Sequence, residues 1–273
     1  MPRVYGHRGC RGLLPENTLP AFLHALQWPI SGLELDVVLS ADGQVVVSHE
    51  PWLNHLICRG PQGELLSEAE GRAFNLYQQP YSRIRRCDCG QLRHPRFPRQ
   101  QTLSAPKPLL REVLAAVEAH ARQRTLPPPE FCIEIKSTPV GDGVFHPAPE
   151  PFAAAVLACL TELRPASPIT LLSFDHRVLQ ALRRQAPAWP LCLLIEDHQP
   201  VAEHLAQLGF QPDSLGIHHP LIDAPLMRFC QQHQLPVTAW TVNTATEVQR
   251  LTALGVQALT TDYPDLVTAV LGL

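Results

Sequence analysis

Short apolar segments alternate with longer amphipathic segments along most of this 273-residue chain. The short segments have the length and composition of buried strands, and the longer ones repeat apolar residues at helical spacing. This pattern predicts strands at Val4–Gly6, Gly32–Leu39, Phe131–Ile135, Ile169–Leu172, Leu191–Ile195, Ser214–Ile217, Val237–Thr241 and Ala258–Thr260. It predicts helices near Leu19–Gln27, Leu109–Arg122, Pro151–Arg164, His176–Arg184, Pro200–Leu208, Pro225–His233, Ala245–Leu254 and Tyr263–Leu271.

Strands that are each followed by a helix predict an α/β fold, a TIM (β/α)8 barrel that spans residues 1–273 as a single domain. A doubly wound open sheet is the competing architecture, because periodicity alone does not show whether a sheet closes. Gly209 and Gly255 stand where glycines that end helices are expected.

The alternation is interrupted at residues 51–107, where Pro, Gly, Gln and Arg are frequent and no period is evident. We expect an insertion here, between the hairpin after the second strand and the second helix, because long excursions in compact domains are functional loops or small subdomains. Its part from Arg83 to Gln100 is rich in arginine. These arginines predict a solvated surface, with a lid that attracts an anionic substrate as the alternative.

Two carboxylates interrupt the apolar second strand. Glu34 and Asp36 are two residues apart, so they face the same way, and burying them is costly unless they are paired or hold a cation. Asp42 and Gly43 predict a two-residue hairpin turn, whose register places Asp36 across from His49. One surface is therefore expected to carry both carboxylates and an imidazole.

Charged side chains also stand at the ends of other predicted strands, where functional groups of a barrel gather. His7 and Arg8 follow the first strand, Glu134 and Lys136 end the third, and Trp240 lies at the end of the seventh. Together with the two carboxylates of the second strand, Glu134 offers hard oxygen ligands for Mg²⁺, Ca²⁺ or Mn²⁺. An arginine and a lysine beside such a cation favour a phosphate, and two histidines can serve as general base and general acid. These residues predict metal-assisted cleavage of a phosphoester.

The runs HRGCRGLLPENTLPAF, from His7, and GLELDVVLSADGQVVVSHE, from Gly32, closely resemble the signature of the glycerophosphodiester phosphodiesterases. The resemblance continues in IEIK (Ile133–Lys136), LSF (Leu172–Phe174), AWTVN (Ala239–Asn243) and TTDYPD (Thr260–Asp265), and so covers nearly the whole chain. It implies a TIM barrel of the bacterial type with an insertion after the second histidine. It also implies hydrolysis of a glycerophosphodiester to glycerol 3-phosphate and an alcohol, with one divalent cation, Mg²⁺ or Ca²⁺, and Mn²⁺ as the alternative.

The resemblance also assigns roles to individual residues. They are His7 and His49 as the acid–base pair, Glu34, Asp36 and Glu134 as metal ligands, Arg8 and Lys136 as phosphate contacts, Trp240 as an apolar wall for glycerol, and Glu16 and Glu50 as supporting carboxylates. The sequence departs from the family pattern at Glu50, where the family usually has Asp after the histidine.

Two other functions remain open. A related phospholipase C- or D-like enzyme that acts on a lysophospholipid or a phosphoinositide would expose apolar residues at the mouth, and the insertion offers only Trp52, Leu53 and Phe97. A barrel that binds phosphate without turnover would be expected to have lost a histidine or a carboxylate, and all are present.

Composition and net charge limit the partners and the cellular location that we expect for this protein. A net charge of -3 gives no basic field for nucleic acid. No apolar run is long enough for integral membrane association, and the first residues do not read as a signal peptide, so we expect a cytoplasmic location. Eight scattered cysteines without paired CxxC spacing are expected to be reduced. A homodimer is left open.

Overall fold

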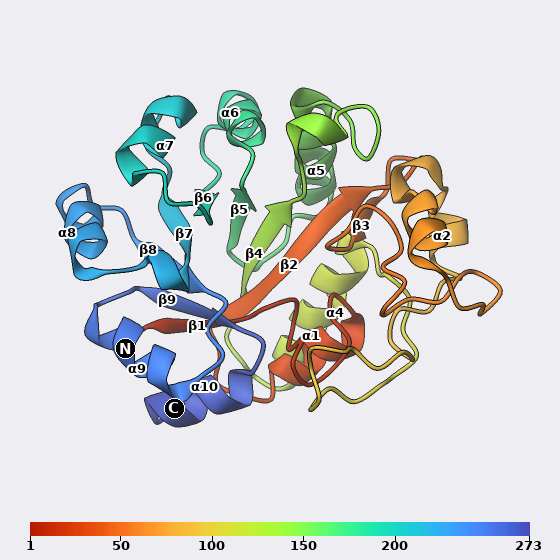
Figure 1. The fold of residues 1–273 in the computed structure, drawn as a ribbon, viewed down its shortest axis with the longest axis horizontal. Helices are drawn as coiled ribbons and strands as arrows, with labels where there is room; N and C mark the ends of the chain where they lie inside the picture. Colours follow the sequence, from red (N-terminus) through yellow and green to blue (C-terminus); the bar gives the residue numbers. More distant parts are fainter.

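The computed structural model describes all residues, Met1–Leu273, and shows eight parallel strands closed into a barrel (Figure 1). The strands are β1 (Arg3–Gly6), β2 (Gly32–Leu39), β4 (Glu130–Ile135), β5 (Ile169–Ser173), β6 (Leu191–Ile195), β7 (Ser214–His218), β8 (Val237–Trp240) and β9 (Ala258–Thr261), with β3 (Val45–Val47) antiparallel beside β2. Because β1 pairs with both β2 and β9, the sheet has no open edge between them, and the predicted TIM barrel is confirmed.

Eight helices surround the barrel, each after one of its strands or, after β2, after the insertion. They are α1 (Leu19–Ala25), α4 (Leu110–Gln123), α5 (Pro149–Leu163), α6 (His176–Gln185), α7 (Val201–Leu208), α8 (Ala224–Gln232), α9 (Ala245–Ala253) and α10 (Pro264–Leu271). Short 3-10 helices lie at η2 (Pro139–Gly141) and η3 (His219–Leu221). Thr18 caps α1 by accepting a hydrogen bond from the Ala21 amide, and Gly209 ends α7 with φ +77°. None of the helices combines the length and the apolar character needed to cross a membrane.

The alternation along β2 separates the core from the site. All eight of its residues are buried; Leu33, Leu35 and Val37 belong to the main apolar core, which also includes side chains of the surrounding helices. Glu34 and Asp36 have the opposite orientation and point into the barrel interior. The core thus fixes the strand whose polar side chains form the site.

The predicted register of the β2–β3 hairpin is wrong by one residue. The turn contains three residues, Ala41 to Gly43, with Gly43 at φ +72°, so Asp36 lies opposite Ser48 instead of His49. A slip of one residue exchanges the two faces of a strand, so strand pairing cannot place His49 beside Asp36. His49 instead reaches the site from the segment that follows β3.

The insertion is more ordered than its sequence indicates. It contains α2 (Glu68–Ala73), η1 (Leu76–Gln78) and α3 (Tyr81–Ile84). Nine of its side chains form a separate cluster of 12 buried residues together with Val38 and Val46 of the β2–β3 hairpin and with Leu109. A disulfide joins Cys58 to Cys89 within this cluster. The prediction that every cysteine is reduced is therefore wrong for these two, and the other six are free.

Candidate active site

A cavity of about 990 Å³ occupies the barrel interior and opens at the carboxyl ends of the strands. Its lining includes nearly all the residues singled out from the sequence: His7, Arg8, Glu34, His49, Glu50, Glu134, Lys136 and Trp240. Asp36 and Glu16 lie directly behind this lining, in contact with Arg8. The structure therefore brings the predicted site residues together.

Three carboxylates meet at one side of the cavity. The register of β2 and β4 places Asp36 beside Glu134, and Glu34, Asp36 and Glu134 each offer an oxygen within 4.8 Å of the others. Burial raises the pKa of Glu34, and the negative charge of Asp36 raises it further. Burial also raises the pKa of Glu134, against the opposing effect of Lys136. Such crowding of buried like charges is favourable only when a cation is close.

The residues present fit a divalent cation. Asp36 Oδ1 is buried without a hydrogen-bond partner, and it belongs to the three-carboxylate group. Two positive charges lie beside the group: Lys136 Nζ is 2.7 Å from Glu134 Oε1 and 3.7 Å from Asp36 Oδ1, and Arg8 Nε is 3.2 Å from Asp36 Oδ2. An all-oxygen donor set is the one that Mg²⁺, Ca²⁺ and Mn²⁺ prefer.

Arg8 is held by a sharp turn after β1. Arg8 has φ 49° and Gly9 has φ +86°, and a Cβ on Gly9 would lie 2.7 Å from the carbonyl carbon of Ala21 in α1. The turn directs the Arg8 amide to Glu34 Oε2, at 3.0 Å. The Arg8 guanidinium donates to Glu16 Oε1 at 2.7 Å, so Glu16 helps to orient Arg8.

Asn17 contributes a contact that the sequence did not identify as functional. Its side-chain amide donates to Asp36 Oδ2 at 2.8 Å. Although burial opposes ionisation, Arg8 and His49 hold the pKa of Asp36 well below its ordinary value, and the Asn17 hydrogen bond adds to this effect. The carboxylate is therefore kept ionised and fixed in orientation.

His7 is buried and oriented by Asp262. Its Nδ1 lies 2.7 Å from Asp262 Oδ1, and its Nε2 faces the cavity, 3.7 Å from Glu34 Oε2. Burial lowers the pKa of His7 to about 4, and the nearby Arg11 guanidinium lowers it in the same direction. The imidazole is thus neutral near pH 7, and an Nδ1–H that donates to Asp262 leaves the Nε2 lone pair directed to the cavity, as a general base requires.

Asp262 is itself held in place by hydrogen bonds from Arg11 and Asn243. Arg11 donates to both of its oxygens, from Nε at 2.8 Å and from Nη2 at 3.1 Å, and Asn243 Nδ2 donates at 2.8 Å. The sequence does contain a signal for Asp262, since it directly follows β9 at a carboxyl strand end. Arg11 has no comparable signal, because its partner is 251 residues away.

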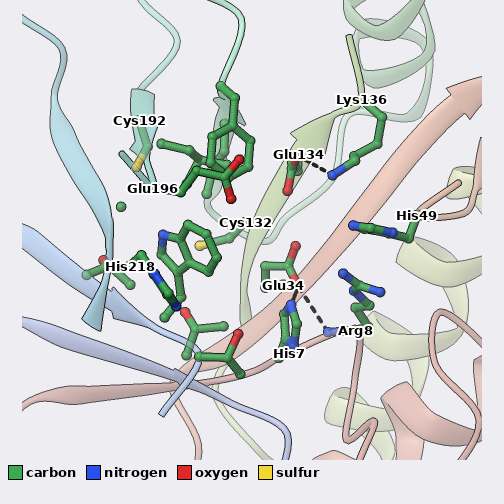
Figure 2. Close-up of a pocket in the computed structure, with 18 of the residues that line it drawn as sticks. His7, Arg8, Glu34, His49, Cys132, Glu134, Lys136, Cys192, Glu196 and His218 are labelled. Atoms are coloured by element: carbon green, nitrogen blue, oxygen red, sulfur yellow. Dashed lines mark hydrogen bonds and ion pairs between the residues drawn. The ribbon is translucent and has the colours of Figure 1, made fainter. Parts of the chain in front are cut away.

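His49 occupies a more open position. Its side chain is 31% exposed, and its Nδ1 lies 3.2 Å from Glu50 Oε1. Against the effect of burial, the hydrogen bond to His49 lowers the pKa of Glu50 to about 2. Figure 2 shows His49 and His7 approaching Glu34 from different sides. The Glu50 side chain, one methylene longer than the Asp expected at this position, therefore still reaches His49.

The opposite wall of the cavity is aromatic. The Trp240 ring lies 5.5 Å from the Phe174 ring and 5.1 Å from the His218 ring, measured between centroids. Trp240 is half-buried and lines the cavity.

The insertion contributes two arginines to the cavity, Arg72 and Arg96. All arginines between Arg83 and Gln100 are exposed, as expected for a solvated surface, and Arg99 forms an ion pair with Asp265. Two of the three apolar residues considered for a lipid-binding mouth are not available to a lipid. Leu53 is fully buried, and Phe97 packs under Arg11.

The sequence profile described as the Glycerophosphoryl diester phosphodiesterase family matches residues 7–266. A glycerophosphodiester phosphodiesterase from Caldanaerobacter subterraneus is 26% identical over 96% of this chain and 94% of its own length. One from Bacillus altitudinis is 48% identical over 54 residues, and the chain spans only 22% of that relative.

Solved structures agree on the fold. A protein from Silicibacter pomeroyi DSS-3, whose name carries this family, is 31% identical, with a TM-score of 0.87 over 99% of this chain and 93% of that one. An Oleispira antarctica phosphodiesterase, solved in complex with the product sn-glycerol-3-phosphate, is 22% identical with a TM-score of 0.79, and covers 100% of this chain and 98% of that one.

Proposed function

Because the chain belongs to the glycerophosphoryl diester phosphodiesterase family, we propose that it hydrolyses a glycerophosphodiester to glycerol 3-phosphate and the free alcohol. One observation carries this proposal: three buried carboxylates, within 4.8 Å of one another, lie at one side of a cavity that is also lined by the imidazoles of His7 and His49. The product bound to the Oleispira antarctica phosphodiesterase supports the choice of substrate.

In this proposal Glu34, Asp36 and Glu134 hold one Mg²⁺ or Ca²⁺ ion, with Mn²⁺ as the alternative. A bound divalent cation polarises the phosphoryl oxygens and stabilises the charge that develops on them. Arg8 and Lys136 contact the phosphate, since a planar fork and a point charge suit its oxygens. Arg72 and Arg96, at the cavity wall contributed by the insertion, attract the anionic diester.

His7 and His49 exchange protons with the substrate. We favour attack on phosphorus by the 2-hydroxyl of the glycerol arm, because this group is already held near the reacting atom. His7 accepts the hydroxyl proton and His49 gives a proton to the departing alcohol, which leaves a five-membered cyclic phosphate. Water then opens this ring with the two transfers reversed, and glycerol 3-phosphate is released.

The remaining site residues orient these groups. Asp262 fixes His7, Glu50 contacts His49, and Glu16 fixes Arg8. Trp240 offers an apolar wall for the glycerol carbons.

The test is release of glycerol 3-phosphate from glycerophosphoethanolamine by purified protein, first after chelation and then with Mg²⁺, Ca²⁺ or Mn²⁺ restored. We expect turnover only with a restored cation, and we expect Glu34→Ala to remain folded but to lose it. Glu203→Ala, an exposed residue of α7 outside the cavity, is the control. Absence of turnover with all three cations, from protein with a native circular dichroism spectrum, would contradict the proposal.

A lysophospholipid is the second candidate substrate. Val140 lies in the cavity lining and is 88% exposed, so an acyl chain could lie against it. Comparing turnover of lysophosphatidylethanolamine and glycerophosphoethanolamine distinguishes the two substrates, and Val140→Asn should lower only the former rate.

A further inference from the structure

The proposed reaction leaves the alcohol arm of the diester without a binding partner in the protein. Glu196 directly follows β6 and lines the cavity. Figure 2 shows Glu196 within the cavity on the side opposite to Arg8, His49 and Lys136. Its side chain is exposed and forms no hydrogen bond or ion pair with another residue, so the carboxylate is available to a ligand.

The surroundings of Glu196 follow from the strand order. β5, β6, β7 and β8 are consecutive in the sheet, so Phe174, Glu196, His218 and Trp240 stand at four successive carboxyl ends. Phe174 is the neighbour of Glu196 on one side and half-buried. Trp240 ends β8, two strands from β6, and its ring lies 5.5 Å from the Phe174 ring between centroids. The two rings therefore form one aromatic surface that extends from Phe174, on the strand next to β6, to Trp240, where the glycerol carbons are proposed to lie.

Glu196 is the only carboxylate that the cavity wall from β5 to β7 contributes to the lining. Arg8, Lys136, Arg72 and Arg96 belong to the other side, where they lie among the carboxylates of the proposed metal site. The wall that carries Glu196 contributes no lysine or arginine to the cavity lining. A molecule with an anionic phosphate and a cationic end would match both sides at once.

We propose that Glu196 binds an ammonium group on the alcohol arm, so that the preferred substrates are zwitterionic diesters of amino alcohols such as ethanolamine or choline. Glu196 supplies the opposite charge, and the Phe174 ring supplies an apolar surface for the methylene or methyl groups. This inference rests on the proposed phosphodiesterase function and names its substrate class.

The test compares kcat/KM for glycerophosphoethanolamine and glycerophosphocholine with that for glycerophosphoglycerol, whose headgroup is neutral. In Glu196→Gln we expect kcat/KM for the two cationic headgroups to fall about fivefold, as expected from about 1 kcal/mol for an exposed ion pair, with the value for the neutral headgroup unchanged. Glu196→Lys should lower kcat/KM for the two cationic substrates further. Glu203→Gln removes the same charge outside the cavity and should change none of the three values.

Each result separates the two proposals. If the wild type hydrolyses no diester with any cation, the proposed function fails. If it hydrolyses all three diesters but Glu196→Gln leaves their ratios unchanged, only the ammonium site is overturned. An equal loss for all three headgroups also overturns it, because Glu196 would then contact the glycerol arm or the phosphate that these substrates share.

Discussion

Asp262→Asn removes the carboxylate that orients His7. Asp262 is 1% exposed and accepts four side-chain hydrogen bonds: one from His7, two from Arg11 and one from Asn243. An amide offers one acceptor oxygen in place of two and turns an N–H₂ group toward donors. At least one donor of His7 or Arg11 must therefore lose its acceptor.

This geometry sets the size of two expected losses, one in stability and one in catalytic rate. Arg11 is buried, and its other acidic neighbour, Glu16, is 3.9 Å away, so its charge becomes poorly compensated. Breaking a buried ion pair costs about 3–5 kcal/mol, and we expect a decrease of that order in the free energy of unfolding. For catalysis, loss of the correct His7 tautomer removes general-base assistance, which typically contributes about 10²- to 10⁴-fold to the rate.

The assay measures kcat and KM for glycerophosphoethanolamine at saturating cation, at a temperature where thermal unfolding shows that the variant is folded. We expect a lower kcat with little change in KM, because Asp262 does not contact the substrate in the proposal. Asp265→Asn, which removes a charge three residues away without touching His7, is the control. A folded Asp262→Asn variant with the wild-type kcat would refute the role of Asp262 in positioning His7.

Four further predictions follow from other parts of the structure. His49→Ala should lose much less activity on a nitrophenyl phosphodiester than on glycerophosphoethanolamine, because an acidic alcohol leaves without a proton; an equal loss would argue against His49 as the acid. A divalent cation at about 100 times its Kd should raise the free energy of unfolding by about 2.7 kcal/mol in thermal unfolding experiments, and Glu134→Gln should abolish the shift. Reducing the disulfide Cys58–Cys89, which spans 31 residues, should lower the free energy of unfolding by up to about 4 kcal/mol; an unchanged Tm after reductant would count against this bond. Burial opposes ionisation of Asp175, but hydrogen bonds from Arg177 and Ser137 lower its pKa, so its stabilisation is present above the unfolded pKa of about 3.9 and is lost as the pH falls through the lower folded pKa. Asp175→Asn should therefore be less stable than wild type at pH 7 and lose less stability on acidification, measured by urea unfolding at both pH values.

The strands were predicted almost to the residue because the signal for them is local. β2 was expected at Gly32–Leu39, as observed, because an apolar run with two carboxylates on one face fits only a strand whose other face is buried. The same alternation put Glu34 and Asp36 on a shared surface. The rule that functional groups stand at carboxyl strand ends then identified Glu134, at the end of β4, and Lys136, directly after it, as candidate site residues.

Errors arose where one residue or a distant contact decides the outcome. The β2–β3 register depends on whether the turn holds two residues or three, and the sequence around Gly43 permits both. The insertion showed no period because its helices are short, and its cluster is completed by side chains of the β2–β3 hairpin. Proximity of Cys58 to Cys89 likewise depends on how the insertion folds back.

By itself, the sequence determined the order of strands and helices and the identity of the groups at the strand ends, because periodicity specifies which way each side chain faces. Only the tertiary structure decided which of these groups share a cavity and what supports them. Asp262 reaches His7 because β9 pairs with β1 across 255 residues of sequence, and Glu196 lines the same cavity as Arg8 because the barrel closes. Such contacts depend on closure of the whole sheet, which no local pattern encodes.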